Sequence, residues 1–290
     1  MTSLVERLSA YLPDRFNRAQ AVVPVVRFAG VIGGGVLRSG LTLAGMAPLL
    51  ERAFSYPRAK AVAILVNSPG GSPVQSHLIY KRIRALAEEK KLPVFAFCED
   101  AAASGGYMIA CAADEVFADP SSIVGSIGVV SSGFGFHELI ARYGVERRLY
   151  ATGENKAILD PFQPEKPEDV ARLRELQKRV FDAFKALVRE RRGERIAEAE
   201  SAELFSGAFW AGEDALQLGL VDGIGDLRSM MRQRFGEKVR LRLVQGPRPG
   251  LLSQFLRQPP GAGSAPESLI DLRAAVAAME ERALWARIGL

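Results

Sequence analysis

A serine surrounded by small residues is the first feature of this sequence that could do chemistry. Ser104 stands in the segment AASGGY, Ala102–Tyr107. Small neighbours let a substrate backbone approach the hydroxyl, and the amide N–H of Gly105 could help to stabilise a developing oxyanion. A serine that opens a helix is also very commonly an N-cap. This segment alone therefore indicates either a nucleophile or a helix cap.

Two adjacent glycines form the second feature. Gly70 and Gly71 end the segment NSPGG, where an apolar run gives way to a polar one. Glycines let the backbone turn sharply and leave amide N–H groups unobstructed, as an oxyanion hole requires. Glycine and proline also mark ordinary turns. Taken alone, the pattern favours a tight turn between a strand and a helix.

A lysine in a glycine-containing loop is the third feature. Lys156 ends the segment GENK. A lysine accepts a proton only when it is neutral, so a site must lower its pKa from about 10.4 by burial or by nearby positive charge. Most lysines are solvated surface charges instead. Lys156 is a candidate base only in combination with the other two segments.

Apolar runs predict the strands that would position these segments. Ala61–Val66 (AVAILV) is continuously apolar, as expected of a strand buried on both faces, and it ends at the glycine pair. In Val22–Phe28, Pro24 indicates an edge strand or a strand start. The other predicted strands are Pro93–Cys98, Glu115–Ala118, Gly125–Val130, Arg147–Tyr150 and Val239–Val244.

Helical segments alternate with these strands, which favours βαβ units and an α/β fold. The predicted helices are Leu41–Tyr56, Ser72–Lys90, Phe136–Tyr143, Pro167–Arg191, Gly212–Leu218 and Ser268–Ile288, with Ala101–Ala112 as a loop that turns into a small-residue helix. The organisation predicted is an amphipathic arm over 1–20, a main domain over 21–244, a Pro/Gly-rich linker over 245–266 and a C-terminal helix over 267–290.

Composition excludes several function classes. Of 290 residues, 48% are hydrophobic and 24% charged, which argues against disorder. The net charge of +5 is spread out without interleaved aromatic residues, so no nucleic-acid partner is expected. Two cysteines indicate free thiols in a reducing compartment, and two histidines leave little material for a zinc site. No metal and no cofactor are expected.

Membrane insertion is not expected either. A spanning helix needs about 20 consecutive apolar residues, and the most apolar N-terminal stretch, 21–37, is interrupted by a proline, an arginine and four glycines. The first residues also lack the apolar core of a signal peptide. Leu4, Leu8 and Leu12 share one helical face that could touch a membrane or another subunit. The expected location is cytoplasmic, with peripheral membrane contact as an option.

Several separated segments, taken in order, resemble a known family. NSPGG, AASGGYMIA, GSIGVV (Gly125–Val130), GENKAILDPF and GLVD (Gly219–Asp222) resemble segments of the SppA-type signal peptide peptidases, also called protease IV. The resemblance covers roughly Val22–Asp226. Ordered segments are much more specific than any single motif. The sequence departs from usual members in having no evident membrane-spanning helix at its start.

The resemblance implies a ClpP/crotonase-like α/β fold, a spiral of ββα units with a C-terminal helical extension. It implies a serine endopeptidase with a Ser-Lys dyad, in which Ser104 is the nucleophile and Lys156 the general base. By position, Ser126 would orient the lysine, and Gly71 and Gly105 would supply the oxyanion N–H groups.

The implied substrates are extended or unfolded peptides, with signal-peptide remnants as one candidate. The implied assembly is a dome-like homo-oligomer. In related enzymes the dyad is completed within one chain in some members and by a neighbouring subunit in others. This chain carries both dyad residues, so every subunit could contribute a full set.

Three alternatives stay open at this point. A ClpP-like Ser-His-Asp triad could use His137, although the surrounding FGFHELIARYG is typical of a helix with a surface histidine. A crotonase-type acyl-CoA enzyme also uses paired N–H groups as an oxyanion hole. A non-catalytic scaffold could keep the fold without the activity.

Overall fold

The chain folds around one mixed sheet, seen in a computed structural model that describes residues 20–33, 40–196, 203–245, 279 and 281–290. Within these residues the sheet order is β6-β5-β3-β2-β1-β8, with β4 beside β3 and β7 beside β4. All pairs are parallel except β5 with β6. The strands are β1 (Val22–Ala29), β2 (Val62–Ser68), β3 (Val94–Ala103), β4 (Glu115–Ala118), β5 (Ile123–Gly125), β6 (Phe209–Ala211), β7 (Gly223–Ile224) and β8 (Arg240–Leu243).

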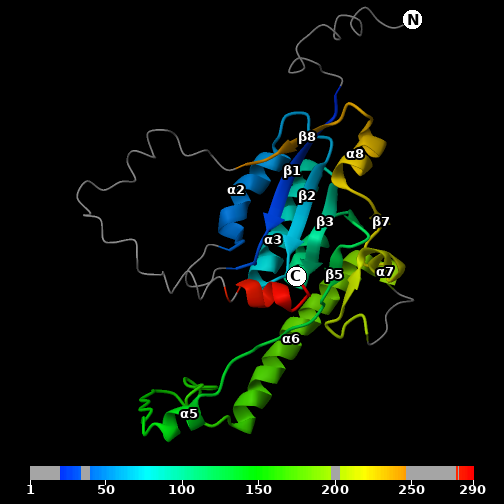
Figure 1. Cartoon of the computed structure of the whole chain (residues 1–290). Helices are drawn as coiled ribbons and strands as arrows, with labels where there is room; N and C mark the ends of the chain where they lie inside the picture. Colours follow the sequence, from blue (N-terminus) through cyan, green and yellow to red (C-terminus); the bar gives the residue numbers. More distant parts are fainter. Residues whose placement is uncertain (1–19, 34–39, 197–202, 246–278, 280) are drawn as a thin grey trace, which may run out of the picture.

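Helices cover both faces of this sheet (Figure 1). They are α2 (Leu43–Phe54), α3 (Pro73–Lys90), α4 (Gly105–Ala110), α5 (His137–Arg142), α6 (Pro167–Arg192), α7 (Gly212–Gln217) and α8 (Leu227–Phe235), with a 3₁₀ turn at Gly193–Ile196. The predicted α/β alternation is therefore confirmed.

Alternating side chains explain why the strands read as continuous apolar runs. On β1, Val26 and Phe28 pack in the large core with α2 and α3, while Val23 and Val25 pack in a second core with Met231 of α8. Successive residues of a strand point to opposite faces, so a strand covered on both faces needs apolar residues throughout.

Strand β3 pairs with two different strands along the same edge. Its first half, Phe95–Cys98, pairs with β4, and Ala101–Ala103 pairs with β5. The prediction that Ala101 begins a loop is wrong, because alanines carry no strong strand propensity and only the pairing with β5 makes them a strand. The helix that follows is correspondingly shorter, Gly105–Ala110.

Polar caps set the starts of the two helices beside the sheet. Thr42 accepts a hydrogen bond from the Gly45 amide at 3.2 Å, and Ser72 accepts one from the Gln75 amide at 3.4 Å. Each cap satisfies an N–H group that has no partner inside its helix. Helices α2 and α3 thus start within two residues of their predicted positions.

Other predictions are corrected by pairing. Strand β1 lies between β2 and β8, so Pro24 is not on an edge strand, and the β1–β2 register begins at Val25, immediately after this proline without an N–H. Residues 147–150 form no strand, since this segment lies on an arm away from any sheet partner. The predicted strand at Gly125–Val130 ends at Gly125.

An arm projects from the body of the molecule. Figure 1 shows α6 running away from the sheet, with α5 and the segment that joins α5 to α6 at its far end. Side chains along this arm are both apolar and exposed: Phe134, Leu139, Tyr143, Val145, Tyr150, Leu176 and Val180. A surface of this kind usually marks an interaction site.

The predicted ends of the chain lie mostly outside the described residues. This applies to the N-terminal arm over 1–20 and to the linker over 245–266, except for residues 20 and 245. Of the predicted C-terminal helix, residues 281–286 are described and helical. Among the described residues, no helix combines the length and apolar character needed to cross a bilayer.

Both cysteines are free and buried in the core. Burial raises the pKa of Cys98 to about 12 and that of Cys111 to about 11. A thiolate is the reactive form, so these thiols are unreactive at neutral pH.

A buried ion cluster fixes the base of the arm. Arg192, the last residue of α6, makes two hydrogen bonds to the Asp222 carboxylate at 2.8 and 3.0 Å, and a third to the Gly219 carbonyl. Asp222 also accepts the Val116 amide of β4 at 2.7 Å. The Arg192 side chain is only 2% exposed. The GLVD segment therefore joins α6 to the sheet.

We predict that thiol reagents will not modify the native protein. At pH 8, a chromogenic disulfide should react with no thiol in the folded protein and with both thiols in urea, because folding buries Cys98 and Cys111. Stoichiometric reaction of one thiol in the native state would contradict the buried packing.

Replacement of Arg192 by alanine should lower the free energy of unfolding by about 3 kcal/mol, because it removes the buried cation of the cluster and leaves Asp222 paired only with the half-exposed Arg195. The control is Arg179→Ala, which breaks an exposed i,i+4 pair with Glu175 and should cost about 0.5 kcal/mol. Urea unfolding followed by circular dichroism measures both. Equal losses in the two variants would contradict a structural role for the cluster.

Candidate active site

Ser104 occupies a strained turn between β3 and α4. Its φ is 53° and its ψ is −118°, a region that non-glycine residues rarely adopt. The backbone is held there on both sides: the Ser104 amide donates to the Gly125 carbonyl at 2.8 Å, and the Ser104 carbonyl accepts from the Met108 amide at 3.0 Å. Such strain costs about 1–3 kcal/mol and persists where the surroundings fix it, often at functional sites.

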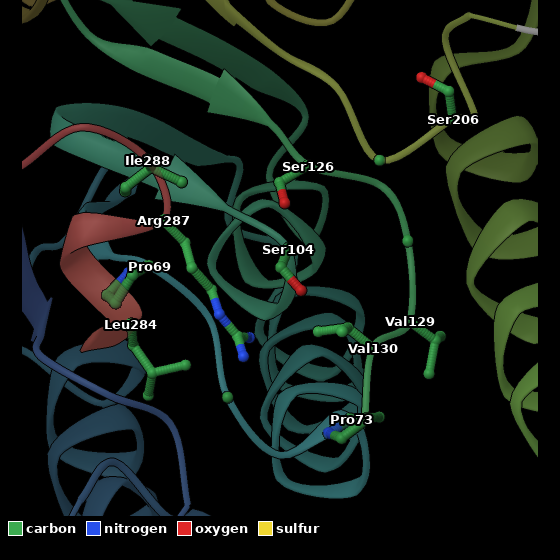
Figure 2. A pocket seen from close by; sticks show the side chains of 13 residues that line it. Pro69, Pro73, Ser104, Ser126, Val129, Val130, Ser206, Leu284, Arg287 and Ile288 are labelled. Carbon is green, nitrogen blue, oxygen red and sulfur yellow. The ribbon is translucent and has the colours of Figure 1, made fainter. Parts of the chain in front are cut away.

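The Ser104 hydroxyl does not cap the helix that follows it. Ser104 is the N-cap residue of α4, yet its side chain makes no capping hydrogen bond. Figure 2 shows the side chain directed into the pocket. The structure therefore excludes the interpretation of Ser104 as a side-chain helix cap, and its hydroxyl stays available for other contacts.

The glycine pair packs directly against this turn. A Cβ at Gly70 would lie 2.8 Å from the Ser104 Cβ, and a Cβ at Gly71 would collide with the Ile32 carbonyl. Both glycines also have positive φ, 107° and 139°. The loop is fixed by hydrogen bonds from the Ile32 amide to the Gly70 carbonyl and from the Ser72 amide to the Ile32 carbonyl, each 2.8 Å. Glycine is required here by close approach.

Two amide groups close to Ser104 have no hydrogen-bond partner among the described residues. Within the described part of the chain, the N–H groups of Gly71 and Gly105 donate no hydrogen bond. Gly105 is buried, and a Cβ there would collide with the Ser76 hydroxyl. Unpaired N–H groups in residues close to a serine hydroxyl have the chemistry that an oxyanion hole requires.

A cavity of about 480 Å³ opens in front of the Ser104 hydroxyl (Figure 2). The structure brings three of the predicted site residues, Gly71, Ser104 and Ser126, to its wall. The remaining lining residues are Pro69, Pro73, Gly128, Val129, Val130, Ser206, Gly207, Leu284, Arg287 and Ile288. The volume is in the range of ligand pockets.

Ser126 is positioned by the antiparallel pairing of β5 with β6. Its φ is 52°, and its amide donates to the Ala208 carbonyl at 2.7 Å. The preceding Gly125 has positive φ and lies against the ring of Trp210, where a Cβ would come within 2.7 Å. In Figure 2 the Ser126 hydroxyl and the Ser104 hydroxyl lie on the same wall of the pocket.

Lys156 is not at this pocket in the single chain. It is exposed and lies in a turn whose backbone bond runs from the Lys156 amide to the Gly153 carbonyl. The turn belongs to the arm, because the Leu159 amide donates to Asp169 at the start of α6 and Phe162 packs on the Phe136 ring. The structure therefore brings Ser104, Ser126 and the glycines together but leaves Lys156 apart.

The histidines do not approach Ser104 either. His137 starts α5 on the arm, with 40% of its side chain exposed, and His77 stacks on Tyr80 of α3. Neither lines the cavity. The arrangement gives no support to a triad that uses His137.

Sequence reasoning missed the C-terminal side of the pocket. Leu284, Arg287 and Ile288 line it, although the sequence places them beyond a proline- and glycine-rich stretch. Their spacing indicates a helix with an apolar face, but no local pattern identifies the surface on which that face docks.

Comparisons with known proteins place this site in a family. Residues 86–239, more than half of the chain, match peptidase family S49. Over its full length the chain is 51% identical to a protein of Brucella abortus named Na(+)/H(+) antiporter NhaA, of which it covers 39%. The chain therefore spans less than half the length of this relative.

Two further proteins complete the comparison. The chain is 31% identical to the putative protease slr0021 of Synechocystis sp., with 74% of this chain and 76% of that protein covered. Among solved structures, a mutant of the 1510-N membrane-bound stomatin-specific protease in complex with a substrate peptide matches 82% of this chain and 98% of its own, at 17% identity and a TM-score of 0.49.

The family match agrees with what the sequence predicted. It supports the ClpP/crotonase-like class for the observed succession of parallel strands and helices, and it leaves the acyl-CoA enzyme without support. The chain therefore belongs to peptidase family S49, and the predicted serine peptidase is confirmed at the level of the family.

Proposed function

We propose that this chain is a serine endopeptidase that cleaves extended or unfolded peptides with Ser104 as its nucleophile. The observation that carries the proposal is the uncapped Ser104 hydroxyl, which faces a cavity that Gly71 also lines, while among the described residues the N–H groups of Gly71 and of the adjacent Gly105 have no partner. Signal-peptide remnants stay a candidate substrate.

The chemistry proceeds through an ester on the serine. Ser104 Oγ attacks the scissile carbonyl carbon while a base takes its proton, and Gly71 and Gly105 donate hydrogen bonds to the resulting oxyanion. The C–N bond then breaks as the base returns the proton to the leaving amine. Water, activated by the same base, hydrolyses the ester and frees Ser104.

Lys156 is the proposed base, and we assign its delivery to the arm of a neighbouring subunit. In the single chain Lys156 lies on the arm and does not line the cavity that contains Ser104. Ser126 is already at that cavity and could accept a hydrogen bond from, or donate one to, an incoming lysine amine. Insertion between two subunits would also withdraw Lys156 from water, which favours the neutral amine that a base requires.

Exposed apolar side chains on the arm support such an assembly. Phe134 is 80% exposed, Tyr143 77% and Tyr150 90%, and all three flank the segment that carries Lys156. A second copy of the chain would bury them and complete the site in the same contact. The expected dome-like homo-oligomer belongs to this proposal.

The cavity suits an extended peptide. Gly128, Val129 and Val130 run along it without pairing in any strand of the described sheet. Their backbone groups can therefore hydrogen-bond to an added strand of substrate, a common mode of peptide recognition.

Substitution of either dyad residue should abolish peptide hydrolysis. Ser104→Ala removes the nucleophile and Lys156→Ala the base, so each should lower kcat/KM about 10³-fold or more on a quenched fluorescent peptide. Lys166→Ala, on the same arm, is the matched control and should keep wild-type activity.

Three results would contradict this assignment. Near-wild-type activity of Lys156→Ala together with an inactive His137→Ala would favour a histidine base. Failure of a fluorophosphonate probe to label Ser104, together with absence of hydrolysis, would favour a non-catalytic scaffold. Full activity of Ser104→Ala would show that Ser104 is not the nucleophile.

Mixing two inactive variants tests whether the dyad forms between subunits. Unfolded and co-refolded Ser104→Ala and Lys156→Ala chains should recover activity, up to about a quarter of wild type if subunits mix at random, because a site is intact only when a Lys156→Ala chain supplies the serine and a Ser104→Ala chain supplies the lysine. A dyad formed within one chain predicts no recovery, since every subunit then lacks one residue. Each variant refolded alone is the control.

A further inference from the structure

The C-terminal segment, residues 281–290, forms part of the wall around Ser104. Leu284, Arg287 and Ile288 line the same cavity as the serine hydroxyl, and Figure 2 shows the Arg287 side chain extending into this pocket beside Ser104. The chain thus returns to the site from a point almost two hundred residues away in sequence.

This segment is anchored by apolar packing. Ile288 is only 4% exposed and packs on Ala101 and Ala103 of β3, together with the partly buried Ile123 and Trp285. Ala103 immediately precedes Ser104. The anchor therefore fixes the segment against the strand that carries the nucleophile.

The segment lines the cavity and does not fill it. About 480 Å³ remain in front of Ser104 with Leu284 and Arg287 in place, within the range of pockets that hold small ligands. Leu284 and Arg287 are therefore placed to contact a peptide bound in the cavity.

Among the described residues that line this cavity, Arg287 is the one that carries a charge. One of its N–H groups donates to the Ser132 hydroxyl at 3.1 Å. Within the part of the chain that the structure describes, no carboxylate lies at ion-pair distance from it. An arginine has five N–H donors in a planar fork that matches a carboxylate, so donors remain for a ligand.

We propose that Arg287 is a specificity-determining residue that selects peptides presenting a carboxylate next to the scissile bond. The proposal rests on the proposed peptidase function. A guanidinium stays protonated at any working pH, so Arg287 takes no part as a base and acts by attraction alone. The carboxylate can come from a Glu or Asp side chain or from the free C-terminus of a short peptide.

Matched peptides test this selection. In a neutral quenched peptide with an amidated C-terminus, Glu or Gln is placed at each position in turn. Wild type should prefer Glu over Gln about five- to tenfold in kcat/KM at one position, and the preference should shrink at high salt. A second series, with free or amidated C-termini, distinguishes the two sources of carboxylate.

Charge reversal gives the sharpest comparison. Arg287→Glu should invert the preference, so that Lys is favoured over Glu at the same position. The matched control, Arg282→Glu, makes the same change of charge in the same segment at a residue that is also exposed but does not line the cavity, and it should keep the wild-type preference. An unchanged Glu preference in Arg287→Glu, or no preference in wild type, would overturn the inference.

Binding separates this inference from the peptidase function. Fluorescence anisotropy with Ser104→Ala measures the affinity for uncleaved Glu and Gln peptides and needs no turnover. A Glu preference in binding without hydrolysis by wild type would refute the peptidase and keep the role of Arg287. Equal binding of both peptides would refute the role of Arg287, whatever the activity. Ile288→Asp should detach the C-terminal segment from β3. If this variant cleaves all peptides faster and keeps the same preference for Glu, then the segment only covers the site, and the proposal that Arg287 selects substrates is refuted.

Discussion

The backbone of Ser104 in the left-handed region is the constraint on which the site depends. It directs the hydroxyl away from the helix that it precedes, and it requires an acceptor for the serine amide, which Gly125 supplies. The turn also brings Ser104 so close to Gly70 that no side chain fits there. The glycine loop, the end of β5 and the start of α4 are therefore all fitted to a single strained residue.

Strand β3 transmits this constraint to the rest of the molecule. Its first half is fixed in the sheet between β2 and β4, and its second half is held by β5, so the serine at its end has little freedom. The small residues Ala101 and Ala103 leave room for Ile288 to pack against the strand. The same short stretch thus positions Ser104 and the C-terminal wall of its cavity.

The arm has the opposite character. Its base is fixed, because the buried Arg192–Asp222 pair joins the end of α6 to β4. Its far end carries exposed apolar side chains and the segment with Lys156, and it makes its contacts within the arm. A rigid base and an unpartnered tip suit an element that reaches a second subunit, which is the assembly we propose for the dyad.

The sequence by itself determined the features that depend on local pattern and on ordered motifs. Continuous apolar runs predicted the core strands, and the helix after the glycine pair was predicted within one residue of its observed start, because such patterns act over a few residues. The ordered segments around Ser104 predicted the family that the comparisons then showed. Only the tertiary structure decided that Ala101–Ala103 is a strand, that the hydroxyl of Ser104 is uncapped, that Lys156 lies apart from it, and that Arg287 lines the same cavity as Ser104. Each of these depends on contacts between residues distant in sequence, whose energies no local pattern of residues encodes.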